Sequence, residues 1–205
     1  MARRKGKTVK YSDALNLAGE YVEWLRDYCL RIEPVGSVKR GDKAEVHDIE
    51  LLLIADQTTP KVEFGQKVIY KTGLDEFLAQ LVQEGVIRQA RNKANGDKLK
   101  RFAIVEYSDV EDFCIELFVV RPETWGIQNV IRTGPREFSR RFVTNKNTGG
   151  LLPNTLQYVK GETKIVTRET GEALSLPEEA DAIAILGIGR IEPSQRWKYG
   201  GVGER

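Results

Sequence analysis

The stretch from Val35 to Ile54 constrains this chain more than any other part of its sequence. It reads V-G-S-V-K-R-G-D-K-A-E-V-H-D-I-E-L-L-L-I, so a Gly-Ser turn and a basic loop lead into an apolar run. The run from His47 to Ile54 is rich in leucine and β-branched residues, which pack well on a pleated surface. We therefore predict a buried β-strand directly after the loop.

Two carboxylates, Asp48 and Glu50, open this predicted strand. Because side chains alternate along a strand, the two share one face and lie about 6.6 Å apart, whereas Ile49, Leu51 and Leu53 enter the core. Two ionised carboxylates so close repel each other unless a cation lies between them. Carboxylate oxygens on a rigid strand suit Mg²⁺, which takes further oxygens from water and substrate phosphates. The pair is therefore a candidate metal site.

The turn before the strand has the residues of a phosphate-binding loop. Gly36 lets the backbone approach an anion closely, and the Ser37 hydroxyl and amide can donate to phosphate oxygens. Arg40 offers paired N–H donors to the same oxygens. A D-x-E pair alone, or a Gly-Ser turn alone, is usually structural. Joined at this spacing, the Gly-Ser turn and the D-x-E pair indicate a phosphate-binding loop that leads into a metal-binding strand. Nucleotidyl transfer needs this arrangement.

A further carboxylate, Glu116, lies inside the apolar run F-C-I-E-L-F-V-V. Burying a carboxylate is costly unless it is paired, hydrogen-bonded or bound to a metal. Two interpretations stay open: a salt bridge or an edge-facing position, and a third metal ligand. In the second, a neighbouring strand about 4.8 Å away would bring Glu116 beside Asp48 and Glu50.

In order and spacing, these motifs resemble those of the family X DNA polymerases, the polymerase beta-like nucleotidyltransferases. The family signature is Gly-Ser, two basic residues, a short loop and then Asp-x-Asp or Asp-x-Glu on a strand, matched here by Gly36, Ser37, Lys39, Arg40, Asp48 and Glu50. The loop is one residue longer than usual, and His47 stands where the family commonly has glycine. The family's third carboxylate is usually an aspartate followed by a proline and an aromatic-containing helix, which Glu116, Pro122 and Trp125 resemble.

A second stretch, R-T-G-P-R-E-F-S-R-R-F, resembles the family's Thr-Gly turn and the helix that lines the incoming nucleotide. The resemblance implies a catalytic set that holds two Mg²⁺ ions, for which Mn²⁺ can substitute: Asp48, Glu50 and Glu116. It implies a nucleotide-binding set made of Gly36, Ser37, Arg40, His47, Thr133, Gly134 and Ser139. It also implies a DNA-binding set made of Arg136, Arg140 and Arg141.

The basic residues of the chain are clustered, although its net charge of +2 is too small to identify a nucleic-acid-binding protein. The clusters are Arg3, Arg4, Lys5, Lys7 and Lys10; Arg88, Arg91, Lys93, Lys98, Lys100 and Arg101; and Arg132, Arg136, Arg140, Arg141 and Lys146. Such clusters fit contacts with a phosphate backbone, although each one alone is usually a solvated face or tail.

Composition and hydropathy exclude several classes of protein. With 40% hydrophobic and 30% charged residues, the chain is typical of a folded protein and not of a disordered one. No apolar run reaches the roughly 18 residues of a membrane helix, and the start lacks the apolar segment of a signal peptide. Cys29 and Cys114 have no metal-ligand spacing and no disulfide framework. We therefore expect a cytoplasmic monomer with core thiols and no membrane partner.

Apolar periodicity and turn residues predict an α+β chain. The expected helices cover residues 12–30, 74–82, 123–131 and 175–186, and a further helix starts at Pro135. The expected strands cover 32–35, 47–54, 67–70, 101–107 and 113–120, with a turn at 108–112, and a hairpin covers 155–168. The resemblance implies a basic arm at 1–11, a polymerase beta-like nucleotidyltransferase palm (a mixed sheet flanked by helices) at 12–134, and a small α+β C-terminal subdomain at 135–205. No residues remain for the lyase subdomain of larger family members, so a minimal form is expected.

The function that the resemblance implies is that of a DNA-directed DNA polymerase, acting in gap-filling repair. It would add deoxynucleotides to a DNA 3′-hydroxyl by two-metal transfer, with a primer-template or gapped DNA and a dNTP as partners. Two alternatives stay open. One is a template-independent or non-DNA nucleotidyltransferase. The other is a non-catalytic protein that binds DNA ends or gaps, its metal site compromised by two glutamates where aspartates are usual.

Overall fold

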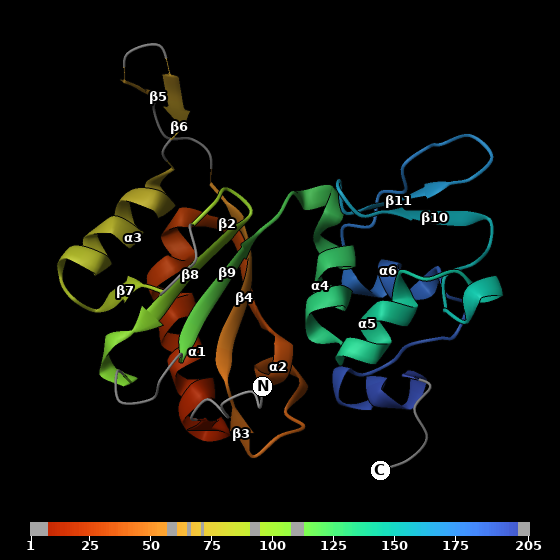
Figure 1. The fold of residues 1–205 in the computed structure, drawn as a ribbon, viewed down its shortest axis with the longest axis horizontal. Helices are drawn as coiled ribbons and strands as arrows, with labels where there is room; N and C mark the ends of the chain where they lie inside the picture. Colours follow the sequence, from red (N-terminus) through yellow and green to blue (C-terminus); the bar gives the residue numbers. More distant parts are fainter. Residues whose placement is uncertain are drawn as a thin grey trace, which may run out of the picture. The chain divides into compact units, whose positions relative to one another are not determined.

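The computed structural model describes residues 8–56, 61–64, 67–70, 72–90, 95–107 and 113–200. The chain divides into two compact units (Figure 1). The first comprises the residues up to Val38 and those from Lys43 to Val119, and the second comprises Lys39–Asp42 and the residues from Val120 onward. Several predicted features lie outside the described residues: Arg3, Arg4, Lys5, Lys7, Arg91, Lys93 and the turn at 108–112.

A five-stranded mixed sheet forms the centre of the first unit (Figure 1). Its strands, in spatial order, are β2 (Cys29–Val35), β4 (Asp48–Ala55), β9 (Cys114–Val119), β8 (Leu99–Ile104) and β7 (Ile87–Gln89). β4 and β9 are parallel, and the other neighbours are antiparallel. The prediction of an α+β fold with a mixed sheet flanked by helices is confirmed.

Two helices, α1 (Tyr11–Leu25) and α3 (Gly73–Gln83), pack against one face of this sheet (Figure 1). Their apolar stripes share a buried cluster with the alternate residues of β4, namely Ile49, Leu51 and Leu53. Alternation therefore leaves Asp48 and Glu50 on the other face of β4. The apolar face of the strand is buried in the core, as the sequence predicts, and the carboxylates are only partly buried.

The first helix is shorter than its apolar pattern predicts. α1 ends at Leu25, and residues 26–28 form a 3₁₀ turn, η1 (Arg26–Tyr28), before β2 begins. The Asp56 amide at the end of β4 donates to the Tyr28 carbonyl at 2.9 Å, so pairing within the sheet fixes this exit. Ser12 lies inside the first turn and does not cap the helix, because its hydroxyl donates to Asp13 Oδ1 at 3.0 Å.

Shorter elements complete the first unit. β1 (Val9–Lys10) pairs with β3 (Glu45–Val46), so part of the predicted basic arm is a strand. β5 (Lys61–Phe64) pairs with β6 (Lys67–Tyr70), which confirms the strand predicted at 67–70. A one-turn helix, α2 (Gly36–Arg40), follows β2 and carries the Gly-Ser motif. No helix of the described residues is long and apolar enough for a membrane crossing.

The second unit combines helices with one β-hairpin. After a 3₁₀ turn, η3 (Pro122–Thr124), come α4 (Trp125–Thr133), α5 (Arg136–Phe142) and a further 3₁₀ turn, η4 (Lys146–Thr148). The hairpin of β10 (Leu156–Val159) and β11 (Lys164–Thr167), α6 (Glu179–Ala184) and the 3₁₀ helix η5 (Pro193–Tyr199) follow. The predicted hairpin is confirmed. α4 belongs to this unit, whereas the sequence placed a boundary after Gly134.

The core of the second unit explains two of its local features. Ile127, Val130 and Phe138 of α4 and α5 share a buried cluster with Ile183 of α6. α4 and α6 approach so closely that a Cβ added to Gly126 would lie 2.0 Å from the Glu178 carbonyl oxygen. α6 begins later than predicted, because Glu178 and Asp181 form its capping box in place of a start at residue 175.

Candidate functional site

The parallel pairing of β4 with β9 places the three predicted carboxylates. Glu50 is in register with Glu116, and Asp48 is in register with Cys114. Residues in register on parallel strands point to the same face of a sheet, and strands lie about 4.8 Å apart. Asp48, Glu50 and Glu116 therefore share the face opposite the core. Sequence reasoning placed Glu116 on the strand beside Asp48 and Glu50, and the register agrees.

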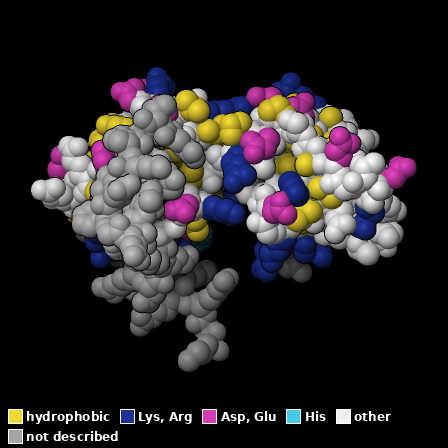
Figure 2. All heavy atoms as spheres, turned by 90° about the horizontal axis from the view of Figure 1, so that it is seen from above, with side chains coloured by type: hydrophobic (Ala, Val, Ile, Leu, Met, Phe, Trp, Pro, Cys, Tyr) yellow, Lys and Arg dark blue, Asp and Glu magenta, His cyan; other side chains and the backbone are white. Residues whose placement is uncertain are grey.

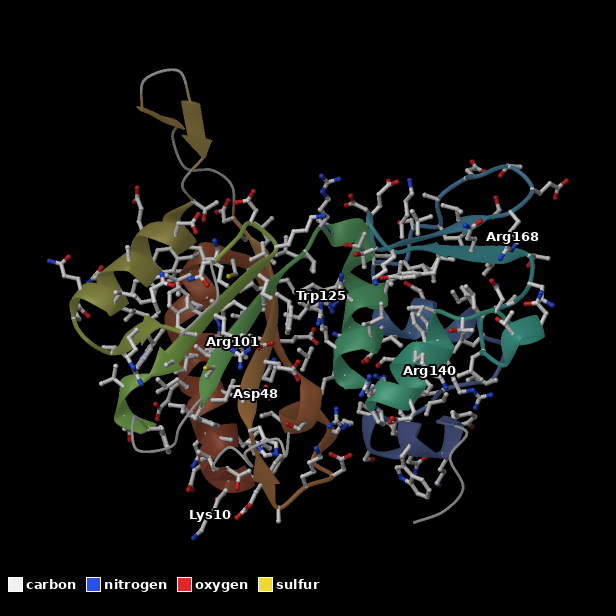
Figure 3. All side chains as sticks on the ribbon, in the orientation of Figure 1. Lys10, Asp48, Arg101, Trp125, Arg140 and Arg168 are labelled. Atoms are coloured by element: carbon white, nitrogen blue, oxygen red, sulfur yellow. The ribbon has the colours of Figure 1, made fainter. Side chains whose placement is uncertain are left out.

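An arginine that sequence reasoning did not assign to the site faces Glu116 from the next strand. Arg101 on β8 is the register partner of Glu116, and its Nη1 lies 3.0 Å from Glu116 Oε1. Both side chains are largely buried, 19% and 15% exposed respectively. The ion pair that the sequence left open as one interpretation of Glu116 is therefore present. Figure 3 labels Arg101 on β8 and Asp48 on β4.

The electrostatics around Arg101 tie it to the candidate site. Burial acts to lower the pKa of its guanidinium, but a hydrogen bond with the Cys114 sulfur and the charges of Glu116 and Asp48 outweigh burial and raise the pKa. Arg101 is thus a fixed cation among the carboxylates. In the sequence, Arg101 follows Lys100 directly and is one of a cluster of basic residues, so its pattern gave no sign of a place in the site.

Gly36 lies directly against one of the carboxylates. Its φ is 65°, in the left-handed region that favours glycine, and a Cβ at this position would lie 1.7 Å from Glu50 Oε2. Val35, the residue before it, is the register partner of Glu50. The Gly-Ser turn and the carboxylate strand are therefore adjacent, with Ser37 only 9% exposed. His47 is exposed just before β4.

The basic residues after the turn are bound within the second unit. Lys39 Nζ donates to Asn129 Oδ1 at 2.8 Å and to Glu179 Oε2 at 3.0 Å. Arg40 Nη1 donates to the Thr133 carbonyl at 3.0 Å, and its Nε lies 3.1 Å from Asp42 Oδ2. Arg40, which the sequence assigned to phosphate, thus holds the Thr-Gly turn in this structure.

The predicted nucleotide-binding residues of the second unit have internal partners. Thr133 is fully buried, and its hydroxyl donates to Asn129 Oδ1 at 3.2 Å. The Ser139 hydroxyl donates to the Ile131 carbonyl at 2.7 Å. A Cβ added to Gly134 would lie 2.7 Å from Ser139 Oγ, so the turn requires glycine. These hydrogen bonds fix the backbone of the turn.

The three arginines that the sequence assigned to DNA divide into two kinds. Arg136 and Arg140 of α5 are exposed, as contact with a nucleic acid requires. Arg141 is partly buried, and it donates to the Gly149 carbonyl at 3.1 Å and to the Tyr199 carbonyl. Its position in the sequence gave no sign of these bonds. The structure therefore offers Arg136 and Arg140, and not Arg141, as surface cations.

A buried ion network that sequence reasoning missed organises the second unit. Glu179 of α6 binds Lys39 and also Arg196, whose Nη2 lies 2.6 Å from Glu179 Oε1 and whose side chain is only 1% exposed. Burial acts to raise the pKa of the Glu179 carboxyl, but the charges of Arg196 and Lys39 outweigh it and lower the pKa. Segment Lys39–Asp42 is thereby fixed to α6.

The donor set on β4 and β9 fits a hard divalent cation in its chemistry. Carboxylate oxygens are the ligands that Mg²⁺ prefers. As the side chains stand, no three His, Cys, Asp or Glu residues of the described chain are grouped closely enough to hold a metal. Glu116 would have to leave Arg101 to join Asp48 and Glu50 around an ion.

No protein-family model matches the chain, and a search of the curated proteins finds none that matches it.

Proposed function

We propose that this protein is a metal-dependent nucleotidyltransferase that adds a deoxynucleotide to a DNA 3′-hydroxyl and releases pyrophosphate. One observation carries the proposal: Glu50 and Glu116 are in register on adjacent parallel strands, with Asp48 on the same face. The Gly36 turn against Glu50 supports it, because phosphate donors and metal ligands then lie side by side. The Gly-Ser turn, the pair Asp48 and Glu50, and then Glu116 follow one another in the order found in the family X polymerases.

The chain's own residues would supply binding, alignment and proton transfer. Asp48, Glu50 and Glu116 would hold Mg²⁺, which when bound acidifies the 3′-hydroxyl and neutralises charge on the pyrophosphate. The amides and hydroxyl of Gly36 and Ser37 would donate to the triphosphate and keep it in line for attack. The 3′-oxygen then bonds to the α-phosphorus, the bond to pyrophosphate breaks, and Glu116 accepts the hydroxyl proton.

A primer-extension assay on gapped, nicked and single-stranded DNA tests the proposal. Each nucleotide is offered separately, with Mg²⁺ or Mn²⁺. We expect template-directed incorporation by the wild type, and none by Asp48→Asn, which should still bind DNA. Asp97→Asn, the same substitution at an exposed position of the first unit, should incorporate normally. Incorporation by Asp48→Asn would overturn the assignment, and indifference to the template would favour a different acceptor.

A non-catalytic protein that binds DNA ends or gaps is the second candidate. The observation that favours it is the Arg101–Glu116 ion pair, which neutralises the carboxylate that two-metal transfer would use. This candidate predicts tight, salt-sensitive DNA binding without any Mg²⁺-dependent product. The same assay separates the two candidates, because only the first forms an extended primer.

A further inference from the structure

Trp197 lies on the surface of the second unit with 51% of its area exposed, whereas Trp125 in the same unit is fully buried. Within the described part of this unit, Trp197 is the one large hydrophobic side chain that is exposed. Single exposed hydrophobic residues are ordinary, so exposure alone indicates no function. The backbone that holds the Trp197 ring and the charges near it do indicate a function.

The segment that carries Trp197 is held firmly from both sides. Arg196 is buried, pairs with Glu179 and lies with its guanidinium carbon 5.7 Å from the centre of the Phe138 ring. On the other side, the Tyr199 carbonyl accepts a hydrogen bond from Arg141. A Cβ added to Gly200 would lie 3.2 Å from Glu137 Cβ. η5 therefore packs along α5, and Trp197 is presented on a fixed backbone.

One exposed cation lies beside this ring, and two others lie on α5, the helix along which η5 packs. Lys198 Nζ lies 5.8 Å from the centre of the Trp197 ring, and Lys198 is exposed. Arg136 and Arg140 are the exposed cations of α5, against one exposed acid, Glu137. On the face of the second unit that Figure 2 shows, Lys and Arg side chains lie among Asp and Glu side chains. We name Trp197, Lys198, Arg136 and Arg140 the Trp197 surface.

The other exposed tryptophan of the described residues, Trp24, has acidic neighbours in place of these exposed cations. Trp24 on α1 is 42% exposed, but it follows Glu20 and Glu23, and its ring packs edge-on against Tyr21. The nearest cation in sequence, Arg26, is paired with Glu23. Acidic neighbours repel a phosphate backbone, so Trp24 is a surface aromatic of similar exposure and opposite electrostatic character.

We propose that the Trp197 surface binds an unpaired stretch of a DNA strand, with a base stacked on the Trp197 ring. Every base has a π-face that stacks on an aromatic ring, and nearby cations follow the backbone phosphates. Lys198, Arg136 and Arg140 supply those cations. The inference rests on the proposed function for its choice of DNA, and it names the single-stranded part of the substrate as the part recognised.

The test is a fluorescence-anisotropy titration of a fluorescein-labelled 12-mer of deoxythymidine with the 205-residue chain, without metal or nucleotide. We expect Trp197→Ala to weaken binding about tenfold, since loss of one stacked base costs roughly that much. Trp197→Phe should retain most of the affinity because it keeps an aromatic face. Trp24→Ala is the matched control and should bind as the wild type does.

Two further measurements separate stacking from general damage. Affinity for a blunt duplex, which offers no unpaired base, should be unchanged in Trp197→Ala. Lys198→Ala should make the slope of log affinity against log salt shallower by roughly 0.7, the loss of one phosphate contact to a single strand. Thermal melts establish that each variant is folded.

The outcomes are distinct from those of the primer-extension assay. Wild-type affinity of Trp197→Ala for the 12-mer would overturn the inference, even if the protein extends primers. Binding by the wild type that depends on Trp197 would uphold it, even if Asp48→Asn removes the catalytic assignment. If the wild type does not bind the 12-mer, the inference falls, and the surface would then fit a protein partner instead.

Discussion

The guanidinium of Arg101 lies 3.0 Å from the carboxylate of Glu116, across the antiparallel pairing of β8 and β9. The negative charge of Asp48 also acts on this guanidinium and contributes to the raised pKa of Arg101. Arg101 therefore balances part of the negative charge on this face of the sheet. A divalent cation that enters the site must compete with it for Glu116.

The first prediction concerns that competition. Arg101→Met should tighten Mn²⁺ binding about tenfold, because it removes a positive charge worth about 1.4 kcal/mol against an incoming cation. Isothermal titration calorimetry or Mn²⁺ electron paramagnetic resonance measures the change. Arg88→Met, an exposed arginine on neighbouring β7, should bind Mn²⁺ as the wild type does. Weaker binding by Arg101→Met would show instead that Arg101 positions Glu116 for the metal.

The second prediction concerns the contact between Gly36 and Glu50. Gly36→Ala should abolish cation binding, since its Cβ would occupy the position of Glu50 Oε2, 1.7 Å away. It should also cost about 1–3 kcal/mol of unfolding free energy, measured by urea denaturation. Gly85→Ala is the control: its φ of 74° is equally left-handed, but no atom lies within 4 Å of the added Cβ. If Gly36→Ala and Gly85→Ala lost cation binding and unfolding free energy equally, backbone strain alone would make glycine necessary at position 36.

The third prediction concerns acid stability. The pKa of Glu179 is lowered in the folded protein by Arg196 and Lys39, against the effect of burial. A depressed carboxyl pKa contributes stability above its ordinary value of 4.5, and that stability is lost as the pH falls through the folded value. Unfolding free energy measured against pH should therefore decline below about pH 4.5 in the wild type.

Glu179→Gln removes that acid-dependent part and leaves Arg196 buried without its anion. We expect a loss of about 3 kcal/mol at pH 7, the usual effect of breaking a buried ion pair. Glu162→Gln breaks an ion pair of much greater exposure, with Lys164, and should change stability by less than about 1 kcal/mol. A comparable loss in both variants would contradict a special role for Glu179.

Local sequence pattern predicted the elements but not their partners. The apolar run after Asp48 predicted β4, and turn residues predicted the hairpin at 155–168, because both depend on neighbouring residues. The end of α1 at Leu25 was missed, because the hydrogen bond from Asp56 to Tyr28 joins distant parts of the chain. Periodicity cannot register such a bond.

In the candidate site, too, the sequence indicates charged residues but not the partners that they bind. The charge at Glu116 is conspicuous within an apolar strand, whereas Arg101 is one of a cluster of basic residues. Their pairing depends on which strands are neighbours. Likewise, the sequence predicts phosphate and DNA as the partners of Arg40 and Arg141, whereas the fold gives them backbone carbonyls. Sequence identifies residues that need a partner, and the tertiary fold selects it.

The division of the chain at Lys39–Asp42 has a consequence for experiments with fragments. These four residues belong to the second unit, while the sequence on both sides of them belongs to the first. A fragment that starts at Val120 would leave Thr133 without the guanidinium that binds its carbonyl and Glu179 with one cation in place of two. Neither unit is therefore a contiguous cassette that can be excised or transplanted at a single junction.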